Sequence, residues 1–230
     1  MTTHILLTGA SRGIGAAIAD TLRERDVKLF AAASNDADLG TAEGPALLWQ
    51  KALERLDGRV DVLINNAGVF EASPLEGADD AWLDQWRRTM TVNLEAAAVL
   101  CRSAILAWQA QGRPGRIVNI ASRAAYRGDS PAHWHYAASK AGMVAMTKTI
   151  ARGYAAQDIL AFAVCPGFTE TGMAGDYLAS RGGARLLEDI PLGRVAQPAE
   201  IATIAAFLAL EAPASMTGAV LDANGASYVR

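Results

Sequence analysis

The chain has 230 residues, of which 51% are hydrophobic, and a formal net charge of −3. This length suits one α/β domain with a large core, and the nearly balanced charge excludes the basic stripe of a nucleic-acid-binding surface. Cys101 and Cys165 form no CxxC pair, which is typical of a reducing cytosol. The chain shows no signal-peptide pattern, and no apolar stretch reaches the roughly 20 residues of a membrane span. We therefore expect one cytoplasmic domain over residues 1–230, without nucleic-acid or membrane partners.

Short apolar runs alternate with helical patterns along the chain. Strand-like runs occur at Ile5–Thr8, Val27–Ala33, Val60–Asn65, Arg116–Ala121, Ile159–Cys165 and Ala219–Asp222. Helical patterns occur at Ile14–Arg25, Ala42–Leu56, about Asp80–Gln111 with a break, His135–Ala156 and Pro198–Leu210. This alternation predicts an α/β fold, with a Rossmann-type doubly wound parallel sheet covered by helices on both faces.

A glycine-rich turn, TGASRGIG at Thr8–Gly15, follows the first strand and opens the first helix. Gly9 permits a tight turn, Gly13 allows the backbone to approach a pyrophosphate, and Gly15 allows close packing of helix and strand. The N-terminus of the helix supplies N–H groups and a partial positive charge for phosphates. A plain βα turn can carry the same glycines, but the position after the first strand favours a dinucleotide site.

Tyr136 and Lys140 lie four residues apart in the predicted helix, so their side chains share one face. A nearby ammonium lowers the pKa of a tyrosine, and the pair would then act as a general acid or base near neutrality. Ser122 ends the strand that precedes this helix, and Asn66 follows another strand. In a doubly wound sheet these strand ends meet at the ligand-binding edge.

These motifs together resemble the short-chain dehydrogenase/reductase family, especially its 3-oxoacyl-carrier-protein-reductase-like branch. The resemblance covers nearly the whole chain, in the family's order. It is carried by TGASRGIG, NNAG at 65–68, Asn93 in TVNLEAA, Ser122, YAASK at 136–140, CPGFTET at 165–171 and PLGRVAQPAEIA at 191–202.

The resemblance implies an NAD(P)-dependent oxidoreductase that moves a hydride between a nicotinamide and a carbonyl or secondary alcohol. Tyr136 would exchange the proton, Ser122 would hydrogen-bond the substrate oxygen, Lys140 would lower the pKa of the tyrosine and bind the ribose, and Asn93 would hold a water. The implied cofactor-binding residues are Gly9, Ser11, Arg12, Gly13, Ile14, Gly15, Ser34, Asn66, Ala67, Gly68, Tyr136, Lys140, Pro166, Gly167, Thr169 and Thr171.

The chain departs from the family between the glycine turn and NNAG, where the family has two βα units. Val27–Asn65 has room for about one, so we expect a six-stranded sheet with the second strand beside the first. The cofactor choice rests on three residues there. Arg12 suits a 2′-phosphate and Ser34 is neutral, which favours NADP(H), whereas Asp36 leaves NAD(H) open.

Other charged and polar residues near the expected site have two interpretations each. His133 and His135 lack a third ligand, so we expect no metal site. Arg123 and Arg127 flank the site and suit carboxylates, or they are solvated arginines of a surface loop. Residues 172–191 are expected to form a lid that selects the substrate.

Two alternatives to the oxidoreductase stay open: a cofactor-free lyase of the same fold, and a nucleotide-sensing or scaffold protein. The first would be expected to lose the glycine turn, and the second Ser122, Tyr136 or Lys140. All are present. The helices that carry Ala96–Ala98 and Ala137–Ala145 have Ala-rich faces, which permit close packing. The resemblance implies that these two helices form a dimer seam, so we expect self-association to a dimer or tetramer.

Overall fold

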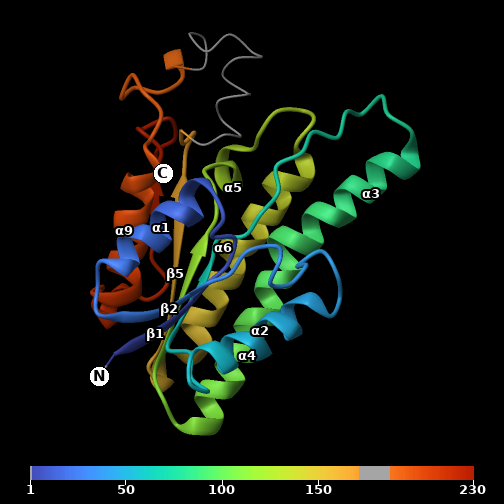
Figure 1. Cartoon of the computed structure of the whole chain (residues 1–230). Helices are drawn as coiled ribbons and strands as arrows, with labels where there is room; N and C mark the ends of the chain where they lie inside the picture. Colours follow the sequence, from blue (N-terminus) through green and yellow to red (C-terminus); the bar gives the residue numbers. More distant parts are fainter. Residues whose placement is uncertain (1, 171–186) are drawn as a thin grey trace.

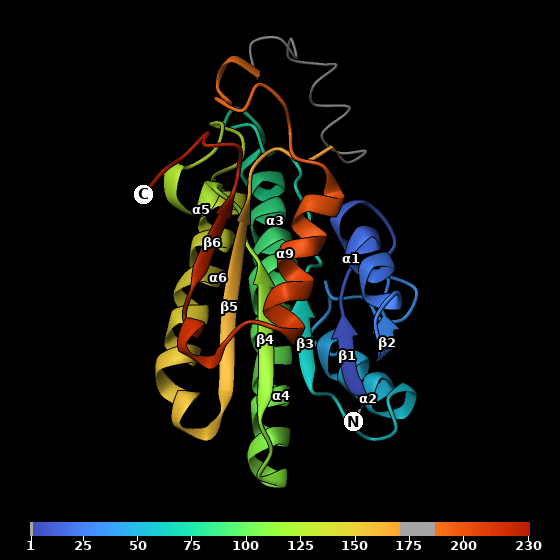
Figure 2. The ribbon, with the colours of Figure 1, turned by 90° about the vertical axis from the view of Figure 1, so that its left-hand side faces the viewer.

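A computed structural model describes residues 2–170 and 187–230. Its centre is a six-stranded sheet, all parallel, in the order β2-β1-β3-β4-β5-β6 (Figure 2). The strands are β1 (Thr3–Leu7), β2 (Val27–Ala31), β3 (Val62–Asn65), β4 (Gly115–Ile120), β5 (Ile159–Pro166) and β6 (Val220–Ala223). The sheet confirms the predicted Rossmann-type fold, its six strands and the pairing of the second strand with the first.

Helices cover both faces of the sheet. α1 (Gly13–Arg23) and α9 (Pro198–Leu210) pack together on one face (Figure 1). The opposite face carries α2 (Gly44–Arg55), α4 (Ala96–Gln111) and α6 (Trp134–Tyr154), with α2 against α4. α2 lies on the same face as α4 and connects β2 to β3. β2 lies at the edge of the sheet, and β1 lies between β2 and β3.

The strands alternate between two apolar layers. Ile5 and Leu7 pack toward α1 and α9, whereas Leu6 packs toward α2 and α4. This is the two-residue period of a strand, and both sets are buried because the parallel sheet is covered on both faces. All eight residues of β5 are buried. The near-continuous apolar runs in the sequence therefore come from strands inside two helical layers.

The long helix of the sequence analysis is continuous, and its expected break is a π turn. α3 (Asp79–Met90) passes through η1 (Thr91–Glu95) into α4, and Asn93 lies in this turn. Such turns insert one extra residue and are frequent at functional sites. By length and composition the helix Asp79–Gln111 could cross a membrane, which corrects our expectation of no such stretch. α4, however, buries Leu100, Ala104 and Trp108 in the core, so we assign it as a core helix.

Short elements complete the described chain. The loop expected after Ser122 contains a helical turn, α5 (Ala124–Arg127), which the sequence analysis missed. The 3₁₀ turns η2 (Ala155–Gln157) and η3 (Ala214–Met216) precede β5 and β6. Most of the expected lid, residues 172–186, and Thr171 lie outside the described residues.

Candidate active site

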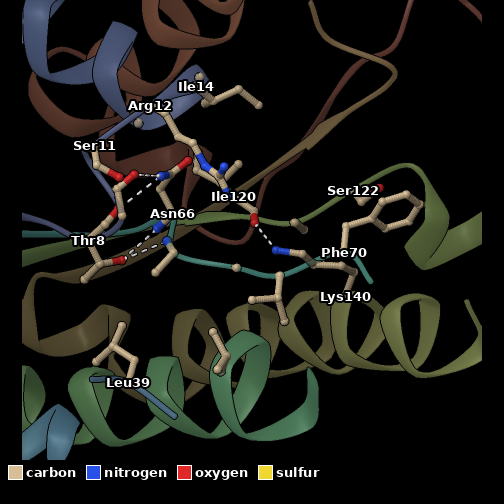
Figure 3. Close-up of a pocket in the computed structure, with 18 of the residues that line it drawn as sticks. Thr8, Ser11, Arg12, Ile14, Leu39, Asn66, Phe70, Ile120, Ser122 and Lys140 are labelled. Carbon is tan, nitrogen blue, oxygen red and sulfur yellow. Dashed lines mark hydrogen bonds between the residues drawn. The ribbon is translucent and has the colours of Figure 1, made fainter. Parts of the chain in front are cut away.

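A cavity of about 600 Å³ opens at the carboxyl ends of β1, β3, β4 and β5. One end is lined by the glycine turn and the start of α1, and the other by Ser122, Tyr136 and Lys140. Figure 3 shows Ser11 and Arg12 at the first end and Ser122 and Lys140 at the second. Every predicted site residue within the described chain lines this cavity except Asn93, which lies directly behind it.

The glycine turn is locked against the start of the NNAG segment. Gly9 has a φ of +67°, and a Cβ there would lie 2.7 Å from Ala67 Cα. The Asn66 amide donates to the carbonyl oxygens of Thr8 (3.1 Å) and Gly9 (2.9 Å). A Cβ on Gly15 would lie 2.0 Å from the Gly9 carbonyl oxygen. These contacts require glycine and hold the N–H groups of α1 toward the cavity.

The donor chemistry of this end fits a dinucleotide pyrophosphate. The α1 N-terminus, the Ser11 hydroxyl and the Arg12 guanidinium face one cavity, and none of them is an acid. The loop after β2 closes the far side through Asp38, Leu39 and Gly40, which the sequence analysis did not select. Gly40 N donates to the Asp38 carboxylate (2.8 Å), so this loop has a defined shape.

Ser34 and Asp36 have different environments. Ser34 lines the cavity, as predicted. Asp36 does not; its carboxylate accepts a hydrogen bond from Ala33 N (2.9 Å) and closes the turn after β2. The described geometry therefore places Arg12 and Ser34, rather than Asp36, at the cavity.

Tyr136 and Lys140 project from one face of α6, as their spacing predicts. The Lys140 ammonium donates to the Ile120 carbonyl oxygen at 2.9 Å (Figure 3). It lies 5.8 Å from the centre of the Tyr136 ring. Lys140 is 4% exposed, and burial lowers its pKa to about 8. Its charge is therefore held by a backbone oxygen at the end of β4.

The pKa of Tyr136 is not lowered, as the sequence predicts, but raised. Burial raises the pKa of Tyr136 to about 12, although part of the side chain faces the cavity, and the neighbouring Ser122 opposes this shift. Lys140 is not among the causes of the shift. In the protein alone desolvation outweighs any ammonium effect, so Tyr136 is protonated at neutral pH.

Asn93 is clamped to the loop after β3. Its Oδ1 accepts a hydrogen bond from Val69 N (2.7 Å), and its Nδ2 donates to Val69 O (3.0 Å) and to Ser139 Oγ (3.3 Å). A Cβ on Gly68 would lie 3.3 Å from Asn93 Oδ1 and 3.5 Å from Lys140 Nζ. The side chain thus positions NNAG against α6, and its expected contact with a water stays a prediction.

The reacting end has aromatic walls that the sequence analysis missed. Phe70 stacks on His133 at 4.0 Å and meets Tyr136 edge-on at 4.7 Å between ring centres. Phe168 lines the same end, and the Arg123 guanidinium lies over its ring at 4.5 Å. Aromatic residues far apart in sequence carry no local signal for such a wall.

His133 and His135, in the segment HWHY at 133–136, are both held by hydrogen bonds next to this wall. His135 Nε2 donates to the Glu71 carbonyl oxygen (3.0 Å), and burial lowers the pKa of His135. His133 Nδ1 lies 2.7 Å from Ser130 Oγ. Within residues 2–170 and 187–230, no group of three or more His, Cys, Asp or Glu side chains could hold a metal ion.

The remaining predicted contacts fall at the end of β5. Pro166, Gly167 and Thr169 line the cavity. A Cβ on Gly167 would lie 2.8 Å from Asn224 Cα, so this glycine permits a close approach of two backbones. The cavity and its lining fit a nicotinamide-dinucleotide-dependent oxidoreductase.

Comparisons with known proteins agree with this class. A family model described as Enoyl-(Acyl carrier protein) reductase matches residues 37–225. The 3-oxoacyl-[acyl-carrier-protein] reductase of Vibrio cholerae is 35% identical over 97% of this chain and 96% of its own length. The enzyme of the same name from Escherichia coli is 34% identical with the same coverage.

Two solved structures are also similar. One is a putative NAD(P)-dependent gluconate 5-dehydrogenase from Beutenbergia cavernae with bound NADP, with a TM-score of 0.83, 34% identity and coverage of 97% and 95% of the two chains. The other is an actinorhodin polyketide ketoreductase variant with NADPH, with a TM-score of 0.84, 30% identity and coverage of 97% and 96%. The chain belongs to the short-chain dehydrogenase/reductase family and is an NAD(P)-dependent oxidoreductase that transfers a hydride between a nicotinamide and a carbonyl or alcohol carbon.

Proposed function

We propose that the protein is an NADP(H)-dependent carbonyl reductase in which Tyr136 is the proton donor. The observation that carries this proposal is the position of Tyr136 beside Ser122 and Lys140, at the opposite end of one cavity from the glycine turn. A bound nicotinamide supplies the hydride. The protein supplies the proton and fixes the carbonyl oxygen.

The roles of the three side chains follow from their positions. The Ser122 hydroxyl and the Tyr136 hydroxyl both hydrogen-bond the carbonyl oxygen, and the Tyr136 proton moves to it as negative charge develops. The Lys140 ammonium, fixed by the Ile120 carbonyl oxygen, stabilises the resulting phenolate and binds the ribose hydroxyls.

The preference for NADP(H) rests on the 2′-phosphate end of the cavity. Arg12 lines it and supplies a positive charge, whereas the Asp36 carboxylate is engaged by Ala33 N. An acid at that position would instead repel the phosphate. The Asp38 carboxylate also lines this side of the cavity, and it accepts a hydrogen bond from Gly40 N. Both solved neighbours hold NADP or NADPH, which supports this choice, and NAD(H) is the second cofactor to test.

The substrate is a small carbonyl compound or its alcohol. The names of the curated relatives point to 3-oxoacyl thioesters, and that of one solved neighbour to gluconate. The description of the family model points instead to a carbon–carbon double bond. Two hydroxyls, Ser122 and Tyr136, at one end of the cavity suit a carbonyl oxygen better than an alkene carbon.

We further propose a homo-oligomer in a reducing cytoplasm. α6 presents Ala137, Ala138 and Ala141 as partly exposed small residues, and α4 exposes 47% of Leu106. Small residues permit close helix packing across a dimer. Cys101 and Cys165 are both free and buried, which fits a reducing compartment. Light scattering at micromolar concentration should give a dimer or tetramer, and a monomer would contradict this assignment.

The function is tested by titrating the protein with NADPH and NADH and then following NADPH oxidation with a carbonyl panel. The panel contains a 3-oxoacyl thioester, simple ketones and oxo acids, with an enoyl thioester as the matched alkene control. We expect tighter binding of NADPH than of NADH and turnover of carbonyls only. Absence of NADPH binding, or turnover of the enoyl compound alone, would contradict the proposal.

A further inference from the structure

Arg123 carries a buried positive charge at the reacting end of the cavity. It is 8% exposed, although arginine is rarely buried, and it lines the cavity together with Ser122 and Tyr136. Its guanidinium carbon lies 4.5 Å from the centre of the Phe168 ring. The side chain therefore belongs to the wall of the site and is not the solvated loop arginine that the sequence also allowed.

Backbone hydrogen bonds hold the segments that carry Arg123 and Phe168. Arg123 N donates to the Pro166 carbonyl oxygen (2.9 Å) at the end of β5, next to the pairing of Ala121 N with Val164 O (2.8 Å). Phe168 O accepts a hydrogen bond from Ala196 N (2.9 Å), which fixes the residue under the guanidinium. A charge on such a support keeps its direction when a substrate enters.

Arg127, four residues along the chain, shows the contrasting case. Its guanidinium donates to the Asp189 carboxylate (2.7 Å) and to the Ser227 carbonyl oxygen (3.2 Å), and it does not line the cavity. Of the two arginines that follow Ser122 in sequence, Arg127 thus lies outside the cavity and Arg123 lines it.

The acid Asp129 also lines the cavity. Its carboxylate accepts a hydrogen bond from Ser130 N (2.7 Å) and lies 4.0 Å from His133 Nδ1. Arg88, Lys140 and Tyr136 are further ionisable residues of the cavity lining. A permanent planar cation beside the carbonyl-binding hydroxyls favours a carboxylate, which it can bind through two parallel hydrogen bonds.

We propose that Arg123 is a specificity-determining residue that binds a carboxylate on the substrate, so that the enzyme prefers oxo acids over neutral ketones and thioesters. This proposal rests on the proposed carbonyl reductase function and assigns its substrate class. It depends on the position of the charge, beside Ser122 and over Phe168, and leaves the proton-donor role of Tyr136 unchanged.

The test uses matched pairs of probes: acetoacetate with methyl acetoacetate, and levulinate with methyl levulinate. kcat/KM is measured with NADPH for the wild-type protein, Arg123→Met and Arg123→Lys. Arg127→Met is the control, since it removes the same charge outside the cavity. We expect the wild type to prefer the acid of at least one pair by tenfold or more. Arg123→Met should lower kcat/KM for that acid by about 10- to 100-fold and leave the ester nearly unchanged.

Arg123→Lys should retain part of the preference, and Arg127→Met should keep the wild-type ratio of acid to ester. A wild type that prefers the esters, or an equal loss for acid and ester in Arg123→Met, would overturn the proposal. If Arg123→Met does not fold, the wild-type ratio and Arg123→Lys decide. A wild type that binds NADPH but reduces ketones and thioesters, and not these oxo acids, also overturns it. Failure to bind NADPH instead overturns the proposed function.

Discussion

Asn93 and Val69 are joined by two hydrogen bonds, one in each direction, between a side-chain amide and a backbone peptide unit. Asn93 lies in the π turn between α3 and α4, and Val69 follows the NNAG segment. The pair therefore couples an irregular helical turn to the loop that lines the cavity. Asn93 is fully buried, so its side-chain amide takes the place of water as the hydrogen-bond partner of the Val69 N–H and C=O groups.

Asn93→Ala should leave the Val69 N–H and C=O without these partners. We expect a loss of about 1–3 kcal/mol in the free energy of unfolding and weaker NADPH binding, because Gly68 and Val69 lose their support. Urea unfolding and a fluorescence titration measure the two effects. Thr91→Ala, a change in the same turn outside the clamp, is the control. Unchanged unfolding in Asn93→Ala would show that the clamp contributes nothing.

Arg12→Ala should weaken NADPH binding by about tenfold and NADH binding much less, since an exposed arginine–phosphate contact is partly screened. Arg23→Ala removes the same charge at the far end of α1 and should change neither affinity. Equal weakening of both cofactors would remove Arg12 as the 2′-phosphate contact. If the wild type prefers NADH and Asp36→Ala loses this preference, the Asp36 carboxylate hydrogen-bonds the ribose 2′-hydroxyl instead.

The pKa of Lys140, lowered by burial to about 8, predicts the pH dependence of reduction. Below that pH the ammonium is charged, and as pH rises through it the charge that supports the phenolate is lost. kcat/KM for reduction should therefore fall above about pH 8, while Tyr136, with its pKa raised to about 12, keeps its proton. Arginine stays charged throughout this pH range, so the fall in kcat/KM above about pH 8 should be absent from Lys140→Arg, whatever activity this variant retains. A limb near pH 8 that persists in Lys140→Arg would assign the titration to another group.

The packing of Gly115 against Trp108 gives a stability prediction that is independent of the site. A Cβ on Gly115 would lie 2.2 Å from Trp108 Cδ2, and the indole is held by its hydrogen bond to Val60 O (2.7 Å). Gly115→Ala should cost about 1–3 kcal/mol of unfolding free energy. Gly153→Ala, where a Cβ meets nothing within 4 Å in α6, should instead stabilise by roughly 0.5–1 kcal/mol. Urea denaturation of both variants checks the opposite signs.

The sequence predicts the features of this protein that depend on local patterns. The parallel sheet of six strands, with the second strand beside the first, follows from apolar runs and right-handed crossovers. Ser122, Tyr136 and Lys140 follow from strand ends and helical spacing. The features it misses depend on contacts between distant segments. Phe70 meets His133 and Tyr136 only through the loop after β3, and Arg123 meets Phe168 only because β4 and β5 are neighbours.

The prediction that the pKa of Tyr136 is lowered is wrong because this pKa also depends on contacts between distant segments. The spacing of Tyr136 and Lys140 indicates a shared face but carries no information on desolvation, which depends on how the whole chain packs around the hydroxyl. The π turn at Asn93 likewise has no pattern in a helical stretch that is apolar on both sides of it.

The most direct test of the account is the turnover of Tyr136→Phe, measured beside its NADPH affinity. The substitution removes the hydroxyl and keeps the ring that meets Phe70. We predict that kcat for carbonyl reduction falls by about 10²–10⁴-fold, while the Kd for NADPH stays within about threefold of the wild-type value. Turnover near the wild-type rate, with NADPH bound, would contradict the assignment of Tyr136 as the proton donor.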